Sequence, residues 1–151
     1  MKLNLGAGAT VVPGFTNLDG ATGDSIYPLS LAYKDVDAIR ASHVLEHFGT
    51  QESQLVLKDW VSCLKIGGTL AIAVPDFTVL IRFMNRGLEL PYESYIMGGQ
   101  TDERDFHKSL WNERKLRLFM EAVGLKNIHT WASEIDDCAK YPFSLNLRGT
   151  K

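Results

Sequence analysis

The first eight residues constrain the fold most, because they join a short apolar strand to a glycine turn. Residues 3–5 alternate leucine, asparagine and leucine, and Gly6, Ala7 and Gly8 follow directly. Glycine adopts backbone conformations that other residues avoid, and it lets a ligand approach main-chain N–H groups closely. Residues 14–19 then read as a second strand that ends in the carboxylate of Asp19, which can accept hydrogen bonds from a ribose diol. Together, these segments predict a site for a nucleoside-containing cofactor.

Length and charge limit the class of protein. A chain of 151 residues that is 45% hydrophobic can bury one good core, so we expect a single domain over residues 1–151. A net charge of −2 disfavours strong nucleic-acid binding and favours a small-molecule substrate. Cys63 and Cys138 form no Cys-x-x-Cys pair, which is typical of a reducing compartment. No segment is long and apolar enough to span a membrane, so we expect a cytoplasmic protein with no membrane contact.

Hydrophobic periodicity predicts alternating strands and helices. Helical spacing occurs over 51–66, between Asp76 and Gly87, and between Asn112 and Gly124. In the second helix, the residues expected to face the core are Phe77, Leu80, Ile81 and Met84. Strands are expected at 36–42, at 69–74 with both faces covered, at 125–131 and 143–147 as an antiparallel pair, and briefly at Ile26. This order predicts an α/β fold with a doubly wound, mostly parallel sheet, whose ligands bind at the carboxyl ends of the strands.

The short connection between Gly8 and Asp19 distinguishes between cofactors. Dinucleotide-binding units place the acid about 20 residues beyond the glycines, after a crossover helix whose N-terminus binds pyrophosphate. Here the third glycine of that fingerprint is absent, and the connection has room for only about a turn of helix. We therefore expect a truncated first crossover helix and a cofactor without pyrophosphate, such as S-adenosylmethionine. A nucleotide-dependent oxidoreductase is the less favoured alternative.

Over its whole length, the sequence resembles the class I S-adenosylmethionine-dependent methyltransferases. It is most similar to the small, type 11-like group with a leucine-glutamate-histidine signature. The resemblance rests on six runs in order: 3–8, 14–19, 41–48, 64–68, 74–77 and 121–125. It implies a seven-stranded sheet with a reversed last strand, and a cofactor packed against the glycine turn with its ribose on Asp19. The residues that we assign to cofactor binding are Leu5, Gly6, Ala7, Gly8, Asp19, Ile26, Tyr27, Ser42 and His43.

The chain departs from that family in ways that leave a second function open. Pro28 stands near the place where many members carry an aspartate for the adenine, so adenine recognition would use the backbone around Ile26 and Tyr27. No helices precede the first strand, although such helices often cover the active site in this family. Either the site is open or a partner subunit covers it, and a homodimer is compatible with the sequence. A non-catalytic cofactor-binding module that acts with a partner is the alternative to an enzyme.

Residues 43–47 spell His-x-x-Glu-His, a pattern that also occurs in inverted zinc peptidases. There the motif lies within a helix of a much larger enzyme, whereas here it directly follows a strand. Some small-RNA 2'-hydroxyl methyltransferases hold a divalent metal with a glutamate-histidine pair at this place, but that arrangement needs further ligands. His107 is the only evident one. From the sequence we therefore assign no metal ion.

Three residues are the candidates for catalysis. His43 and Asp76 follow the strands at 36–42 and 69–74, and His107 lies in the 88–111 segment, where helical periodicity lapses. A connection of that length is typical of a lid or substrate loop. Asp76 also reads as a helix cap. We expect methyl transfer to an oxygen or nitrogen of a small-molecule or saccharide acceptor, with His43 or His107 accepting the proton.

Overall fold

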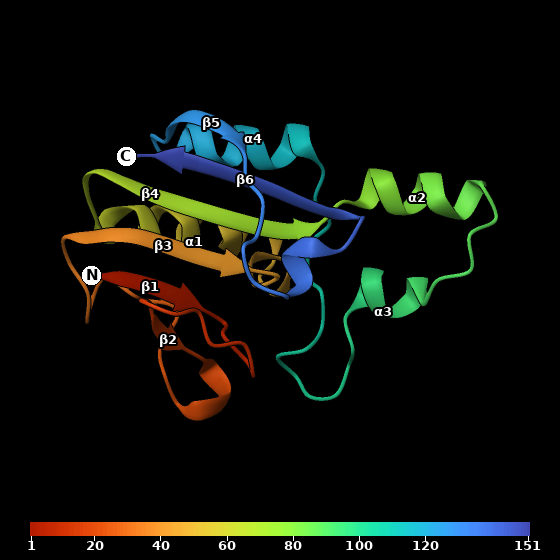
Figure 1. Cartoon of the computed structure of the whole chain (residues 1–151), viewed down its shortest axis with the longest axis horizontal. Helices are drawn as coiled ribbons and strands as arrows, with labels where there is room; N and C mark the ends of the chain where they lie inside the picture. The colour runs from red at the N-terminus through yellow and green to blue at the C-terminus, as the bar shows by residue number, and fades with distance from the viewer.

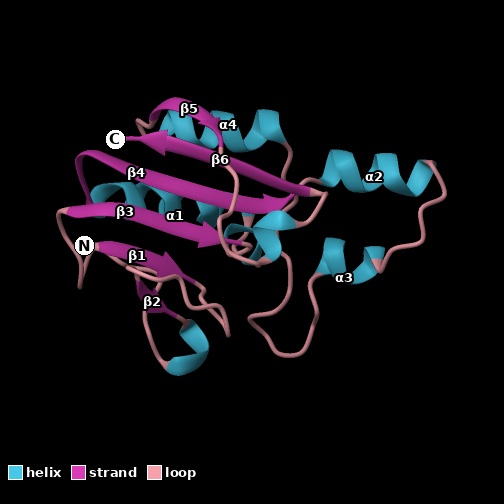
Figure 2. Ribbon diagram, in the orientation of Figure 1, coloured by secondary structure: helices cyan, strands magenta, loops and turns pink.

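The computed structural model describes residues 1–151 and is built around one six-stranded sheet (Figures 1 and 2). The strand order is β2-β1-β3-β4-β6-β5, in which the first four strands are parallel and β6 is antiparallel to both neighbours. This confirms the mostly parallel α/β sheet with antiparallel strands at its end. The strands are β1 (Lys2–Leu5), β2 (Thr16–Leu18), β3 (Val36–Ser42), β4 (Leu64–Pro75), β5 (Lys126–Thr130) and β6 (Ser144–Thr150).

The sheet has six strands, so the expectation of seven was wrong. Ile26 lies in an irregular segment between β2 and β3, where no strand forms. Its carbonyl accepts a hydrogen bond of 2.7 Å from Trp60 Nε1, and the Leu29 N–H donates to the Asp59 carboxylate at 2.5 Å. Side chains of a helix at Thr50–Cys63, α1, thus satisfy backbone groups that a strand would pair with a neighbour.

Two helices cover one face of the sheet. They are α1 (Thr50–Cys63) and α4 (Glu113–Ala122), which lie side by side behind the strands in Figure 1. The other face is crossed by the connection from β5 to β6, which contains a short 3-10 helix, η3 (Cys138–Lys140). Between β1 and β2 the chain makes only turns, which confirms the truncated first crossover. No helix in the structure has the length and apolar character needed to cross a membrane.

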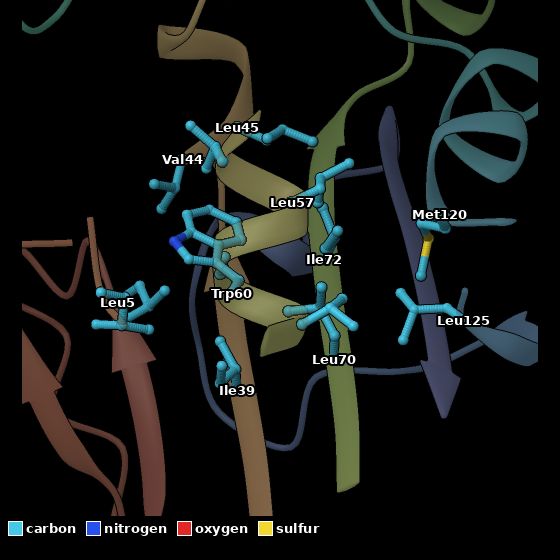
Figure 3. Packing of buried hydrophobic residues seen from close by; sticks show 14 of the residues in the cluster. Leu5, Ile39, Val44, Leu45, Leu57, Trp60, Leu70, Ile72, Met120 and Leu125 are labelled. Carbon is cyan, nitrogen blue, oxygen red and sulfur yellow. The ribbon is translucent and has the colours of Figure 1, made fainter. Parts of the chain in front are cut away.

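The alternation of residues along the strands explains this uneven cover. On β1, Leu3 and Leu5 are fully buried in the core, while Asn4 between them faces the opposite side. Asn4 accepts a hydrogen bond of 2.9 Å from Arg40 Nη1, so the opposite face carries polar side chains. Such alternation is typical of a sheet with one strongly apolar face. The core itself centres on Trp60 of α1, which packs among leucines and isoleucines of the strands (Figure 3).

Helix α1 ends at Cys63, three residues earlier than the sequence pattern indicated. The reason is that Leu64 pairs with Val36 and begins β4. Gly67 and Gly68 therefore lie within β4, where they do not end the helix. An added Cβ at Gly68 would lie 2.9 Å from the Val36 carbonyl oxygen, so this close approach requires glycine.

Helix α2 (Phe77–Asn85) buries less of its apolar face than expected. Leu80 is buried, but Ile81 and Met84 are 39% and 46% exposed. The helix runs beyond the end of the sheet together with α3 (Tyr92–Met97), so it has little to pack against (Figure 1). The assignment of Ile81 and Met84 to the core was therefore wrong. Capping was predicted better, because Asp76 accepts hydrogen bonds from the first turn of α2 and Asn112 from that of α4.

Candidate functional site

A cavity of about 650 Å³ opens at the carboxyl ends of β1, β2 and β3. Its wall combines the glycine turn, the start of the segment after β2, the β3–α1 connection and residues 101–108. The lining residues are Gly6, Gly8, Asp19, Gly20, Ala21, Ile26, His43, Val44, His47, Phe48, Glu52, Thr101, Asp102, Arg104, Asp105 and Lys108. The position agrees with the general rule that ligands of parallel α/β sheets bind beyond the carboxyl ends of the strands.

The glycine turn forms one wall of this cavity in a conformation that suits glycine. Gly6 has a φ of +62°, and a Cβ on it would overlap the Val44 side chain. Gly8 has a φ of +52° and open space around it. Between them, the Ala7 N–H donates to the Leu18 carbonyl at 3.0 Å, which holds the turn against β2. Two glycines thus leave the backbone bare where a ligand would lie.

Asp19 lies at the end of β2 and faces the turn. Its Oδ2 accepts a hydrogen bond of 2.6 Å from the Gly8 N–H, and its Oδ1 accepts one of 2.7 Å from the Ala21 N–H. The second bond caps a short 3-10 helix, η1 (Gly20–Thr22). Both carboxylate oxygens are therefore fixed in the cavity wall, and each keeps a free lone pair for a ligand hydroxyl.

The cavity carries more negative than positive side chains. Four carboxylates line it, while Arg104 and Lys108 are the only lysine or arginine residues; the carboxylates are Asp19, Glu52, Asp102 and Asp105. Arg104 also donates to the Gly20 carbonyl at 3.1 Å, so the 101–108 segment contacts η1 across the cavity. An acidic site of this kind suits a ligand with positive charge.

His43 lies at the end of β3 with a φ of +54°, an uncommon conformation for a residue with a side chain. Its Nε2 lies 3.0 Å from Ser144 Oγ, and its Nδ1 lies 3.4 Å from Glu46 Oε1. Burial, together with the nearby His107 and His47, lowers the pKa of His43 to about 4. The imidazole is therefore neutral near neutral pH, and a weaker base than an exposed histidine.

Glu46 is the most unusual group near the cavity, because its side chain is 1% exposed and neither carboxylate oxygen has a hydrogen-bond partner. It belongs to a 3-10 helix, η2 (Leu45–His47). Burial raises the pKa of Glu46 to about 8, so near neutral pH the contact with His43 joins two neutral groups. His107 Nε2 lies 4.0 Å from Glu46 Oε1, and the His47 and His107 rings meet edge to face at 4.9 Å.

Several residues expected in the cofactor site lie outside the cavity. Leu5 is fully buried in the core, and Tyr27 packs edge to face on Phe48 with ring centroids 6.1 Å apart. The Ser42 hydroxyl donates to Asp137 at 2.8 Å, and it borders a separate hollow of about 220 Å³ together with Ala7. Of the nine expected cofactor residues, the cavity wall includes Gly6, Gly8, Asp19, Ile26 and His43.

Of the three catalytic candidates, the structure brings His43 and His107 to the same carboxylate, that of Glu46, and leaves Asp76 apart. His43 lines the cavity, and His107 lines a small neighbouring pocket that also touches Glu46. Asp76 lines neither pocket, because its Oδ1 accepts hydrogen bonds from the Thr78 and Val79 N–H groups at 2.9 and 3.3 Å. Its role in the structure is that of a helix cap.

Sequence reasoning missed the contributions of Glu52, Asp102 and Arg104 to the cavity, and it gave Glu46 no role. The polar run at 101–108 within the expected lid carried a usable signal for Asp102 and Arg104. Glu46 lies in the His-x-x-Glu-His run, but its lack of hydrogen-bond partners depends on distant segments that no local pattern reveals.

Comparison with known proteins supports the fold at low sequence similarity. No protein-family model and no curated protein matches the chain. Its fold is similar to that of a SAM-dependent methyltransferase from Archaeoglobus fulgidus (16% identity, TM-score 0.62, 99% of this chain and 85% of that one). It is also similar to an O-methyltransferase family protein from Burkholderia thailandensis (14% identity, TM-score 0.61, 99% and 50%).

A third similar structure is the complex described as that between "the Haloferax volcanii Trm112 methyltransferase activator and the putative methyltransferase" (14% identity, TM-score 0.58, 99% and 80%). The chain spans different shares of the proteins that it resembles, from 85% of the Archaeoglobus fulgidus protein to 37% of a similar structure from Nostoc punctiforme. The four structures share an overall fold with this chain at TM-scores of 0.57 to 0.62. The chain therefore has the fold of the class I S-adenosylmethionine-dependent methyltransferases.

Proposed function

We propose that this protein transfers a methyl group from S-adenosylmethionine to an oxygen or nitrogen of a small-molecule or sugar acceptor. The observation that carries the proposal is the bond between the Gly8 N–H and the Asp19 carboxylate, at the ends of two adjacent parallel strands and in the wall of a large cavity. A bare glycine backbone beside a fixed carboxylate provides close approach for a cofactor and acceptors for its ribose hydroxyls.

The residues around the cavity have separate roles in cofactor binding and in proton acceptance. Gly6 allows the turn to pack on Val44, which a Cβ would overlap, and Asp19 is placed to accept hydrogen bonds from a ribose. The excess of carboxylates favours a cationic ligand over an anionic one. S-Adenosylmethionine supplies an activated methyl group when bound, so the protein has mainly to orient the acceptor and remove a proton. His43 accepts that proton in this proposal, because it lies in the cavity wall.

Isothermal titration calorimetry with S-adenosylmethionine tests the cofactor site. We expect the wild type to bind and Asp19→Ala to bind about 10- to 100-fold more weakly, the effect of losing hydrogen bonds to a charged acceptor. The matched control is Asp136→Ala, because Asp136 is exposed and lies outside the cavity. No binding by the wild type, or equal binding by wild type and Asp19→Ala, would contradict the proposal.

A second candidate function is a cofactor-binding module that needs a partner subunit, including a second copy of this chain. The observation in its favour is the uncovered apolar side of α2, where Ile81 and Met84 are 39% and 46% exposed. A single-turnover methylation assay on a panel of hydroxyl and amine acceptors, combined with light scattering, separates the two. A monomer that methylates an acceptor supports the enzyme, while binding without turnover supports the module.

An oxidoreductase reading loses support because residues 6–15 form no helix. A dinucleotide would lack the helix N-terminus that usually binds its pyrophosphate. We expect no quenching of NADH fluorescence at concentrations where S-adenosylmethionine binds. Tight NADH binding would instead revive this alternative.

A further inference from the structure

Three side chains beside the cavity converge on one point without hydrogen-bonding to one another. Glu46, His47 and His107 each offer one ligand atom, and these atoms all lie within 4.8 Å of one another. Two of them come from η2, whereas His107 comes from the segment after α3. The backbone fixes this meeting, because the N–H groups of Lys108 and Ser109 donate to the Glu46 carbonyl at 2.7 and 3.2 Å. The convergence is therefore part of the fold.

Two of the three side chains, Glu46 and His47, also have buried polar atoms without hydrogen-bond partners. Glu46 is 1% exposed and both of its carboxylate oxygens lack hydrogen-bond partners, as does the buried Nδ1 of His47. Buried polar groups are normally hydrogen-bonded, and buried carboxylates are normally paired or bound to metal ions. The lone pairs of Glu46 and His47 thus point to a ligand that accepts electron density. A cation can bind these lone pairs, whereas a hydrogen-bond acceptor cannot.

We propose that Glu46, His47 and His107 bind a divalent transition cation of the zinc or cobalt type. Two imidazoles and one carboxylate form a ligand set that such ions prefer, and three protein ligands leave a coordination position open. The ligand atoms of tetrahedral zinc lie about 3.3 Å apart, so the side chains must close by about 1.5 Å at most from their present positions. This proposal replaces the sequence-based expectation that the chain binds no metal.

His43 lies next to the proposed ligand Glu46. Its Nδ1 lies 3.4 Å from Glu46 Oε1, and its other ring nitrogen contacts Ser144 Oγ at 3.0 Å. A second group that contacts a metal-binding carboxylate orients it and tunes its affinity for the ion. His43 is thus held between the proposed cation and the Ser144 hydroxyl.

The location of the cluster suggests what the cation does, and this step rests on the proposed function. His47 lines the large cavity, while Glu46 and His107 line the small pocket next to it. An acceptor hydroxyl at the open coordination position would become more acidic. It would give its proton to His43, and its oxygen would then bond to the methyl carbon as the carbon–sulfur bond breaks and sulfur keeps the electron pair. The cation therefore favours a hydroxyl acceptor over an amine.

Cobalt titration of the chelator-treated full chain tests the site directly. We expect one equivalent of Co²⁺ to produce the visible absorption of a four- or five-coordinate ion with nitrogen and oxygen ligands. Removing one ligand, in Glu46→Gln or His107→Gln, should weaken binding at least about 100-fold, more than the loss of a supporting residue usually does. His129→Gln is the matched control, because His129 is an exposed histidine on β5. It should bind Co²⁺ as the wild type does.

Two outcomes would overturn the proposal: no cobalt spectrum in the wild type at millimolar Co²⁺, or unchanged affinity in Glu46→Gln. Circular dichroism and S-adenosylmethionine calorimetry on the same samples separate this result from misfolding and from failure of the proposed function. If the protein bound S-adenosylmethionine but not Co²⁺, only the metal site would be refuted. Cobalt binding that depends on Glu46, without any cofactor binding, would support the metal site and refute the methyl donor.

Discussion

Two clusters of buried and partly buried polar side chains lie near His43, and they differ in how completely they are hydrogen-bonded. In the first, the Asp137 carboxylate accepts hydrogen bonds from Arg40, Ser42 and Ser133. Burial alone would raise the pKa of Asp137, but these bonds and the Arg40 charge hold it below its usual value. This cluster ties β3 to the β5–β6 connection, and it is complete without any ligand.

The second cluster contains Glu46, His47 and His107, and it is incomplete. No hydrogen bond reaches the Glu46 carboxylate, and burial lowers the pKa of both histidines while it raises that of Glu46. The difference between the clusters indicates which polar groups stabilise the fold and which are available to bind a ligand. A complete cluster stabilises the native state, while an incomplete one costs stability until a ligand binds.

Breaking the complete cluster should have the largest effect. Asp137→Ala leaves the Arg40 guanidinium buried without its partner, so we expect the free energy of unfolding to fall by about 3–5 kcal/mol. Urea denaturation followed by tryptophan fluorescence measures this loss. The neighbouring exposed residue provides the control, since Asp136→Ala should change stability by less than about 0.5 kcal/mol. A loss below about 1 kcal/mol for Asp137→Ala would show that the first cluster is not structural.

The glycine turn gives the next largest effect, because Gly6 packs on Val44, which lies between the two clusters in the chain. In Gly6→Ala, the new Cβ overlaps the Val44 side chain at a positive φ, so we expect a loss of about 2–4 kcal/mol from steric overlap and backbone strain together. Gly8→Ala has a similar φ but open space, and should lose only about 1–2 kcal/mol. Denaturation of the two variants in parallel isolates the steric part. Equal losses would mean that Val44 moves aside freely.

Replacing the unsatisfied carboxylate should have the opposite sign. Glu46→Met keeps the side-chain length and removes two buried oxygens without partners, so we expect the chelated protein to gain about 1–3 kcal/mol of unfolding free energy. Denaturation in the presence of a chelator measures the gain, and Asp19→Asn serves as comparison because its carboxylate accepts two N–H bonds. A destabilised Glu46→Met would indicate that the second cluster supports the fold after all.

The sequence was sufficient wherever local chemistry decides the structure. The strand at 36–42, the caps Asp76 and Asn112, and the glycine turn beside Asp19 were all found from short patterns, because each depends on neighbouring residues. The absent strand at Ile26 was different. Its backbone groups are satisfied by side chains of α1, and no local pattern carries that information.

The candidate site shows the same limit more clearly. Glu46 and His47 stood out as part of a short motif, and His107 was named only as the one evident further ligand, without a pattern that brings it to them. Their meeting depends on backbone hydrogen bonds that bring residues 108–109 onto Glu46. Likewise, Ser42 ends the β3 strand, where a cofactor contact was expected. Its hydroxyl instead donates a hydrogen bond to Asp137, which lies in a distant segment of the chain. Long-range partners decide which polar side chains stay free.

An exposed ion pair completes the comparison and should show the smallest effect. Asp37 is bonded to Lys65 and to the terminal amine of Met1, and the hydrogen bond from Lys65 is the largest cause that lowers the pKa of Asp37 from 3.8 to about 2. Because the folded pKa is the lower one, the stabilisation is present above pH 3.8 and is lost as the pH falls through about 2.

Lys65→Met tests this small contribution through the thermal midpoint measured over a series of pH values. We expect the midpoint to lie slightly below that of the wild type above pH 3.8, and the two curves to converge as the pH falls to about 2. Lys58→Met is the control, because Lys58 is exposed on α1 and forms no ion pair. Since solvent screens exposed pairs strongly, a Lys65→Met effect as large as that of Asp137→Ala would remove the distinction between exposed and buried charge on which the comparison of the two clusters depends.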